Sequence, residues 1–169
     1  MPNLRPFFLL LAFAAAGLAG AAHWSKPELS GLLTDPELDE LSGLAASRVK
    51  PDVLWGLNDG GNLANLIAIT PDARHLATLH VKGVGNIDWE DLDGFTLDGK
   101  HYLMIADTGD NGGMRDVLSL HFIEEPAKIV DGMSVEPAWT TRFRWPDGAR
   151  DCEASAVDAA SGEVLLVSK

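Results

Sequence analysis

Cysteine is nearly absent from this sequence. Cys152 is the only cysteine in 169 residues, so the chain can form no internal disulfide. A catalytic thiol needs an electropositive setting that favours the thiolate. Cys152 instead lies between Asp151 and Glu153, whose negative charges oppose ionisation of the thiol. We therefore expect Cys152 to be a small buried side chain rather than a nucleophile.

Basic residues are scarce relative to acidic ones. Thirteen Lys and Arg residues face 25 Asp and Glu residues, which gives a formal net charge of −12. A chain this acidic repels phosphate backbones, so no nucleic-acid partner is expected. Acidity can simply aid solubility, but a dense local cluster of carboxylates can also hold Ca²⁺.

Several motifs of known chemistry are missing as well. The chain has no H-E-x-x-H zinc motif, no G-x-S-x-G nucleophile elbow and no phosphate-binding Walker sequence. The loop at residues 107–112 resembles the start of an EF-hand loop. Its twelfth position, however, is Leu118, where a bidentate glutamate is required. These absences exclude the corresponding zinc protease, α/β-hydrolase, nucleotide-binding and EF-hand sites.

Long apolar runs are confined to the N-terminus. Residues 7–22 read FFLLLAFAAAGLAGAA and follow a single cation, Arg5. The run is too short to span a bilayer comfortably, which takes about 20 residues. Ala19 and Ala21 form an A-x-A cleavage site. We therefore expect residues 1–22 to be a secretory signal peptide. The mature protein should be periplasmic or secreted, with no membrane segment after cleavage.

The rest of the chain alternates short apolar runs with turn residues. Residues 23–39 form a lead-in segment that contains Pro27 and Pro36. Nothing after residue 22 keeps a helical period, and short runs bounded by Gly, Pro, Asn and Asp predict an all-β protein. The predicted strands lie at 41–46, 53–57, 63–69, 76–81, 92–97, 102–106, 117–123, 140–145, 154–157 and 164–167.

The strand pattern repeats along the chain. Overlaying the cycles aligns Glu40, Glu90 and Glu153 just before the first strand of each, and the second strands match as VLWGLND, YLMIAD and VLLVSK. Four strands in about 40–50 residues are typical of a β-propeller blade. A β-sandwich with acids before its strands is the alternative. We predict a partial propeller over 40–169, with about two and a half four-stranded blades at about 40–83, 90–145 and 153–169. A closed propeller needs roughly four to eight blades, so we expect a fragment of a longer protein, or closure by assembly.

A propeller would bring the repeated acids together. The first strand of each blade lines the central channel, so Glu40, Glu90 and Glu153 should converge at one channel mouth. Carboxylates this close need a cation, and Ca²⁺ suits oxygen ligands. Turn capping by the aspartates and structural ion pairs of the glutamates are the alternatives. Glu90 and Glu153 are the predicted catalytic groups. The predicted metal ligands are Glu40, Asp59, Asp88, Glu90, Asp107, Asp110 and Glu153.

The strings ELSGLAAS, LWGLNDGGN, NIDWEDLDGF, YLMIADTGDN and DCEASAVD together resemble a family of exported bacterial propeller proteins. This is the phytase-like and esterase-like grouping, near the gluconolactonase and TolB-like propellers. The resemblance extends from about Glu40 to Lys169. It implies a six-bladed propeller, incomplete here at its C-terminus, with an acidic channel that can bind metal.

Two functions follow from this resemblance and from the acids. One is metal-assisted hydrolysis of a phosphoester, ester or lactone, in which a cation such as Ca²⁺ polarises the substrate and activates water. Glu90 or Glu153 would then be a ligand or the general base. The other is a non-catalytic propeller that binds a small molecule or a partner in the periplasm.

Overall fold

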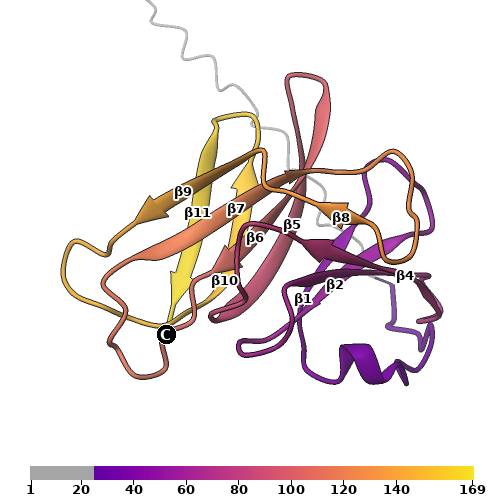
Figure 1. Ribbon diagram of the computed structural model, residues 1–169, viewed down its shortest axis with the longest axis horizontal. Helices are drawn as coiled ribbons and strands as arrows, with labels where there is room; N and C mark the ends of the chain where they lie inside the picture. Colours follow the sequence, from indigo (N-terminus) through magenta and orange to yellow (C-terminus); the bar gives the residue numbers. More distant parts are fainter. Residues whose placement is uncertain (1–24) are drawn as a thin grey trace, which may run out of the picture.

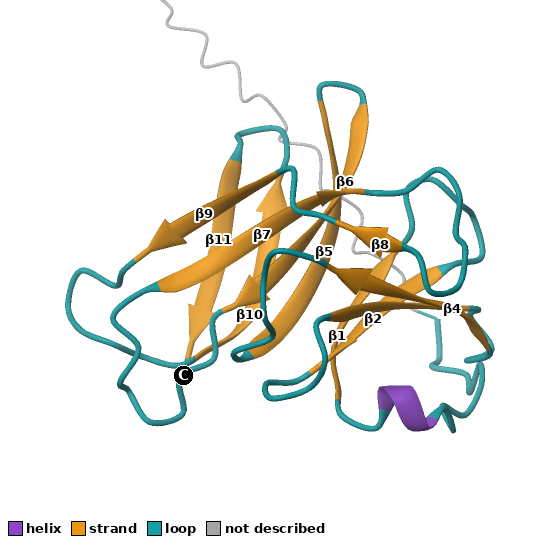
Figure 2. Ribbon diagram, in the orientation of Figure 1, coloured by secondary structure: helices purple, strands orange, loops and turns teal. Residues whose placement is uncertain are grey.

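The structure is a computed structural model that describes residues 25–169. The predicted signal peptide at 1–22 therefore lies outside the described residues. Within this range the protein is all-β, with eleven strands and one short 3-10 helix, η1 (Pro36–Leu38). Figure 2 shows that strands and loops make up nearly all of the fold. No helix between residues 25 and 169 has the length and apolar character needed to cross a membrane.

The strands form three sheets that follow one another along the chain (Figure 1). The positions and order of the predicted strands agree with those observed, which confirms the all-β class. The first sheet contains β1 (Leu41–Ala46), β2 (Leu54–Asn58), β3 (Asn65–Ile69) and β4 (His75–Val81). The second contains β5 (Trp89–Leu97), β6 (Lys100–Asp107), β7 (Leu118–Glu124) and β9 (Trp139–Phe143). The third is the hairpin of β10 (Cys152–Asp158) and β11 (Glu163–Ser168).

One strand was not expected from the sequence. Strand β8 (Ser134–Val135) lies in the connection between β7 and β9 and pairs in parallel with β4, at the edge of the first sheet. Two residues are too few to show a period of two. The connection is also tied down nearby, because the Thr78 N–H donates to the Asp131 carboxylate at 2.9 Å. The connection between two strands of the second sheet thereby covers the edge of the first.

The turn between β5 and β6 follows directly from its residues. Asp98 and Gly99 both have positive φ, at 49° and 76°, between the paired residues Leu97 and Lys100. A two-residue turn with positive φ at both positions matches the twist of antiparallel strands and favours Asp-Gly.

The apolar core lies between successive sheets. Strand β6 is buried on both faces, and its side chains alternate between two cores. Leu103 and Ile105 pack with Trp55 and other residues of the first sheet. Met104 joins a second cluster that includes Phe95, Tyr102 and Phe122 and packs against the partly buried Val157, Val164 and Leu166 of the third sheet.

A buried carboxylate also joins the first two sheets. Glu125 directly follows β7 and is 5% exposed. It accepts hydrogen bonds from the Trp55 indole N–H at 2.9 Å and the Arg48 N–H at 2.9 Å, and from the Ser47 hydroxyl. Three donors satisfy this buried charge, so it links the sheets instead of opposing folding.

The first strands of the three sheets lie side by side, because β5 contacts both β1 and β10. A Cβ on Gly43 of β1 would lie 2.6 Å from the Leu92 nitrogen of β5, so this close approach requires glycine. On the other side of β5, Asp91 accepts the Ser155 N–H at 2.6 Å and Asp93 accepts the Val157 N–H at 2.7 Å. Side chains, rather than a backbone ladder, therefore connect β5 to β10.

Candidate functional site

The candidate site forms at the start of β5, where the strand carries a β-bulge. Trp89 pairs with Asp107 and Asp91 pairs with Ala106, so Glu90 is the extra residue between them. A bulge redirects a side chain out of the regular alternation. Glu90 is only 4% exposed, and its backbone carbonyl accepts the Ser42 hydroxyl at 2.7 Å.

The same bulge occurs at the start of β1 and of β10, and it corrects the predicted repeat. The extra residue is Ser42 in β1 and Glu153 in β10. The pairing register therefore aligns Ser42, not Glu40, with Glu90 and Glu153. The predicted overlay of Glu40 was two residues out of register. A bulge leaves no pattern in the sequence, and the second and third sheets have an acid both before the first strand and at the bulge.

Backbone hydrogen bonds support the corrected alignment. Glu40, Asp88 and Asp151 each stand directly before the first strand of a sheet. Their carbonyls accept N–H groups from the end of the second strand or the loop after it. The donors are Asp59 at 2.9 Å, Gly109 at 3.1 Å and Lys169 at 3.1 Å, respectively.

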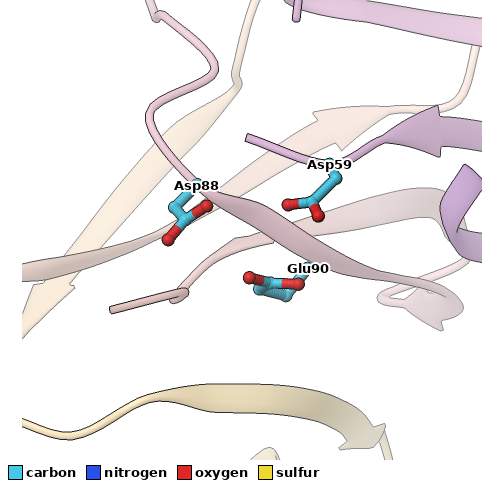
Figure 3. A group of neighbouring side chains, drawn as sticks. All are labelled: Asp59, Asp88 and Glu90. Atoms are coloured by element: carbon cyan, nitrogen blue, oxygen red, sulfur yellow. The ribbon is translucent and has the colours of Figure 1, made fainter. Parts of the chain in front are cut away.

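Two groups of carboxylates meet at Glu90. In each group, one oxygen of every carboxylate lies within 4.8 Å of the others. The first group is Asp59, Asp88 and Glu90, which Figure 3 shows close together: Asp88 and Glu90 lie at the start of β5, and Asp59 directly follows β2. The second is Glu90, Asp151 and Glu153. The site thus draws its acids from all three sheets, and predicted residues Asp59, Asp88, Glu90 and Glu153 are among them.

Gly60 and Gly109 leave the space that the carboxylates of the first group occupy. A Cβ on Gly109 would lie 2.2 Å from Glu90 Oε1 and 2.4 Å from Asp88 Cγ. A Cβ on Gly60 would lie 2.1 Å from Asp88 Oδ1. Two backbone segments therefore press directly against these carboxylates, and any larger residue would displace them.

The electrostatics of the first group are unfavourable in the absence of a cation. Burial, together with the charges of Asp59, Glu153, Asp88 and Asp151, raises the pKa of Glu90 to about 7. Burial and the Asp59 charge also raise the pKa of Asp88. The Ser42 hydroxyl is 3.3 Å from Glu90 Oε2 but closer to the Glu90 carbonyl, at 2.7 Å. A hydroxyl has one proton to donate, so the Glu90 carboxylate receives little compensation. Among residues 25–169, no Lys, Arg or His forms an ion pair with any acid of this group.

The second group already contains a positive charge. Lys169 Nζ lies 2.5 Å from Glu153 Oε1 and 3.0 Å from Asp151 Oδ2. These hydrogen bonds raise the pKa of Lys169. Burial opposes ionisation of Asp151, but hydrogen bonds from the Asp110 N–H and from Lys169 hold the pKa of Asp151 below its usual value. The Lys169 ammonium therefore balances the negative charge of the second group. The first group has no such cation among the described residues.

The other predicted ligands lie outside both groups. Glu40 accepts a hydrogen bond from the Asn62 amide at 2.7 Å. Asp107 pairs with Arg115 at 2.8 Å and accepts the Asp88 N–H at 3.1 Å. Asp110 accepts two backbone N–H groups, including that of Arg115 at 2.9 Å. Asp107 and Asp110 thus hold the loop after β6 beside the site.

The sequence prediction missed Asp151 and Ser42. Asp151 precedes Cys152 as Asp88 precedes Trp89, so an overlay with the correct register would have identified it. Cys152 itself is fully buried, as expected from its neighbours, and burial raises the pKa of its thiol.

Comparison with known proteins assigns no family. The chain matches no protein-family model, no curated protein and no solved structure. The resemblance to exported propeller proteins stays a prediction, and function has to be argued from the site.

Proposed function

We propose that this protein is an exported β-propeller that binds a divalent cation, with Ca²⁺ as the preferred ion, between Asp59, Asp88 and Glu90. The observation that carries the proposal is the buried Glu90 carboxylate, which faces other carboxylates and no cationic partner among the described residues. A bound cation would reverse this repulsion and fix the three acids together.

Three features of the fold support a propeller. Successive antiparallel sheets follow the chain order, their first strands lie side by side, and all three begin with the same bulge. Apolar cores fill the space between neighbouring sheets. This is the arrangement that radial blades require, and the six-bladed form comes from the family resemblance. Export follows from the predicted signal peptide at 1–22.

The chemistry of the ligands favours calcium. The group offers carboxylate oxygens only, with no His or Cys. Hard cations prefer such oxygens, whereas zinc and copper sites use nitrogen or sulfur. Ca²⁺ accepts irregular geometry and roughly six to eight oxygens, some from water. Asp59 is partly exposed, so one side of the ion would be open to water or to a ligand.

Metal-assisted hydrolysis of a phosphoester, ester or lactone is a second candidate function. The specific observation in its favour is that open side, where a small-molecule substrate could reach the ion. The cation would polarise the substrate oxygen and lower the pKa of a bound water. Glu90 and Glu153 are the candidates for ligand and general base. The same site without turnover would serve a non-catalytic periplasmic binding protein.

Calorimetric titration of the protein with Ca²⁺ and with Mg²⁺, combined with thermal unfolding, tests the cation site. We expect Ca²⁺ to bind saturably and to raise Tm, because a ligand at 100 times its Kd adds about 2.7 kcal/mol of stability. Glu90→Gln should abolish this response. It should also raise the Tm of the metal-free protein, since it removes the repulsion. The control Glu163→Gln, at an exposed position of β11, should respond to Ca²⁺ as the unmodified protein does. Absence of both binding and stabilisation would overturn the proposal.

A further inference from the structure

One face of the third sheet is apolar and uncovered. Strand pairing places Ala154 opposite Val167 and Ala156 opposite Leu165, and alternate residues of a strand share a face. All four side chains are exposed, and Leu165 and Val167 are 57% and 64% exposed. The other face of the same hairpin packs against the second sheet. The uncovered face, which we call the front face, is therefore turned away from the rest of the described chain.

The equivalent face of each of the other two sheets is buried. The shared bulge register aligns Leu165 with Trp55 of β2 and with Met104 of β6. Trp55 packs against residues of the second sheet and Met104 against residues of the third, and both side chains are 0% exposed. The front face of a sheet in this fold is thus the one that the back face of another sheet covers.

The first sheet has an uncovered back face. Leu44 of β1 aligns with Leu92 of β5, because each lies two residues after its bulge. Leu92 is 3% exposed and packs against the first sheet, whereas Leu44 is 49% exposed. Leu41, which aligns with the buried Trp89, is 38% exposed. The lead-in segment covers this back face over β2 and β3, and it leaves these leucines of β1 uncovered.

The two uncovered faces are complementary in the same way as the contact between the first and second sheets. There, a Cβ on Gly43 would lie only 2.9 Å from the Leu92 Cβ, so a very small residue of one sheet faces a leucine of the next. Ala154 aligns with Gly43 and is also small, whereas β5 has Asp91 at this position. The front face of the third sheet therefore fits a back face that presents a leucine, as the first sheet does with Leu44.

We propose that a second copy of this chain covers the front face of the third sheet, with Leu41 and Leu44 of its first sheet packed on Ala154, Leu165 and Val167. The reciprocal contact then joins the third sheet of the second copy to the first sheet of the first copy. Two copies of three sheets each form a closed two-fold ring, within the range of roughly four to eight blades of closed propellers. A closed ring buries both faces in each copy, so assembly stops at the dimer.

This inference rests on the propeller arrangement of the proposed function but not on its cation. Asp59, Asp88 and Glu90 all come from one copy, and none of them belongs to either of the uncovered faces. Dimer formation and calcium binding are therefore separate properties, and one can fail without the other.

Sedimentation equilibrium of the mature chain, residues 23–169, over a wide range of protein concentration tests the dimer. We expect a dimer and no larger species. Leu165→Glu and Leu44→Glu each place a carboxylate in the contact, and each should weaken dimer formation by about a hundredfold or more, because burial of an unpaired charge is costly. The uncharged Leu165→Ser should weaken it about tenfold and serves if Leu165→Glu does not fold. Val130→Glu is the control, at a 58% exposed position outside both faces, and should leave the dimer unchanged.

Mixing Leu44→Glu with Leu165→Glu tests which faces meet. The intact first sheet of one variant can pair with the intact third sheet of the other, so dimers should reappear in the mixture with one unmodified contact. A contact between two third sheets would instead leave Leu44→Glu dimeric by itself, and this result would overturn the proposal. An unmodified protein that stays monomeric, or that grows into larger oligomers with concentration, would also overturn it. Titration of Leu165→Glu with Ca²⁺ should still show binding, so that a failed dimer is distinguished from a failed cation site.

Discussion

The Ser42 hydroxyl donates a hydrogen bond to the backbone carbonyl of Glu90, 2.7 Å away. The two residues occupy equivalent bulge positions in neighbouring sheets. The bond therefore joins β1 to β5 at the bulge that carries Glu90, the candidate metal ligand.

We expect Ser42→Ala to lower the free energy of unfolding by about 1 kcal/mol, because the Glu90 carbonyl loses its donor. Calcium affinity should also fall, since the bulge is less firmly held. Ser30→Ala is the matched control, because its hydroxyl also donates to a carbonyl, that of Pro71 at 2.7 Å, but at an exposed position. Urea unfolding with and without Ca²⁺ measures both effects. Equal changes in the two variants would argue against a special role for Ser42.

The stability of the metal-free protein should depend on the ionisation of Glu90. Its pKa is raised from 4.5 to about 7 in the folded protein. The folded state therefore holds this proton more tightly than the unfolded state. Stability should fall as the pH rises from about 4.5 to about 7, by on the order of 1–3 kcal/mol.

Denaturant unfolding across this pH range measures that loss. The contribution should be absent in Glu90→Gln, and saturating Ca²⁺ should remove or reverse it. A stability profile that is the same in Glu90→Gln and in the unmodified protein would contradict this assignment.

Gly109→Ala should disable the cation site without unfolding the sheets. The new Cβ would lie 2.2 Å from Glu90 Oε1 and would push the carboxylates apart. We expect at least a tenfold loss of calcium affinity, which corresponds to about 1.4 kcal/mol. Gly85→Ala is the control, because a Cβ there meets no atom within 4 Å. Titration calorimetry of both variants measures calcium affinity. Unchanged affinity in Gly109→Ala would show that Ca²⁺ does not bind between these carboxylates.

Glu125→Leu should be the most damaging of these substitutions. It leaves the Trp55 indole N–H, the Ser47 hydroxyl and the Arg48 N–H without their acceptor, and we expect a loss of about 3–5 kcal/mol. The neighbouring Glu124→Gln removes only an exposed pair with Lys100 and should cost less than about 1 kcal/mol. Thermal unfolding compares the two, and similar Tm values would show that Glu125 is not a link between the sheets.

The sequence carried the strand order but not the details of the site. Turn residues such as Asp98 and Gly99 marked where strands end, because their backbone preferences are local. The bulge at Glu90 left no such mark, since it depends on how two strands pair. As a result Glu40 was aligned incorrectly and Asp151 was missed. Strand β8 was missed for a similar reason: its partner β4 is distant in the sequence and only two residues pair.

The carboxylates of Asp91 and Asp93 have a further consequence for solubility. They occupy the N–H groups of Ser155 and Val157 on the side of β10 that does not face β11. A free row of strand amides is a template on which another chain can add. These two aspartates therefore occupy donors that an added strand would need, so this edge of β10 is a poor template for aggregation.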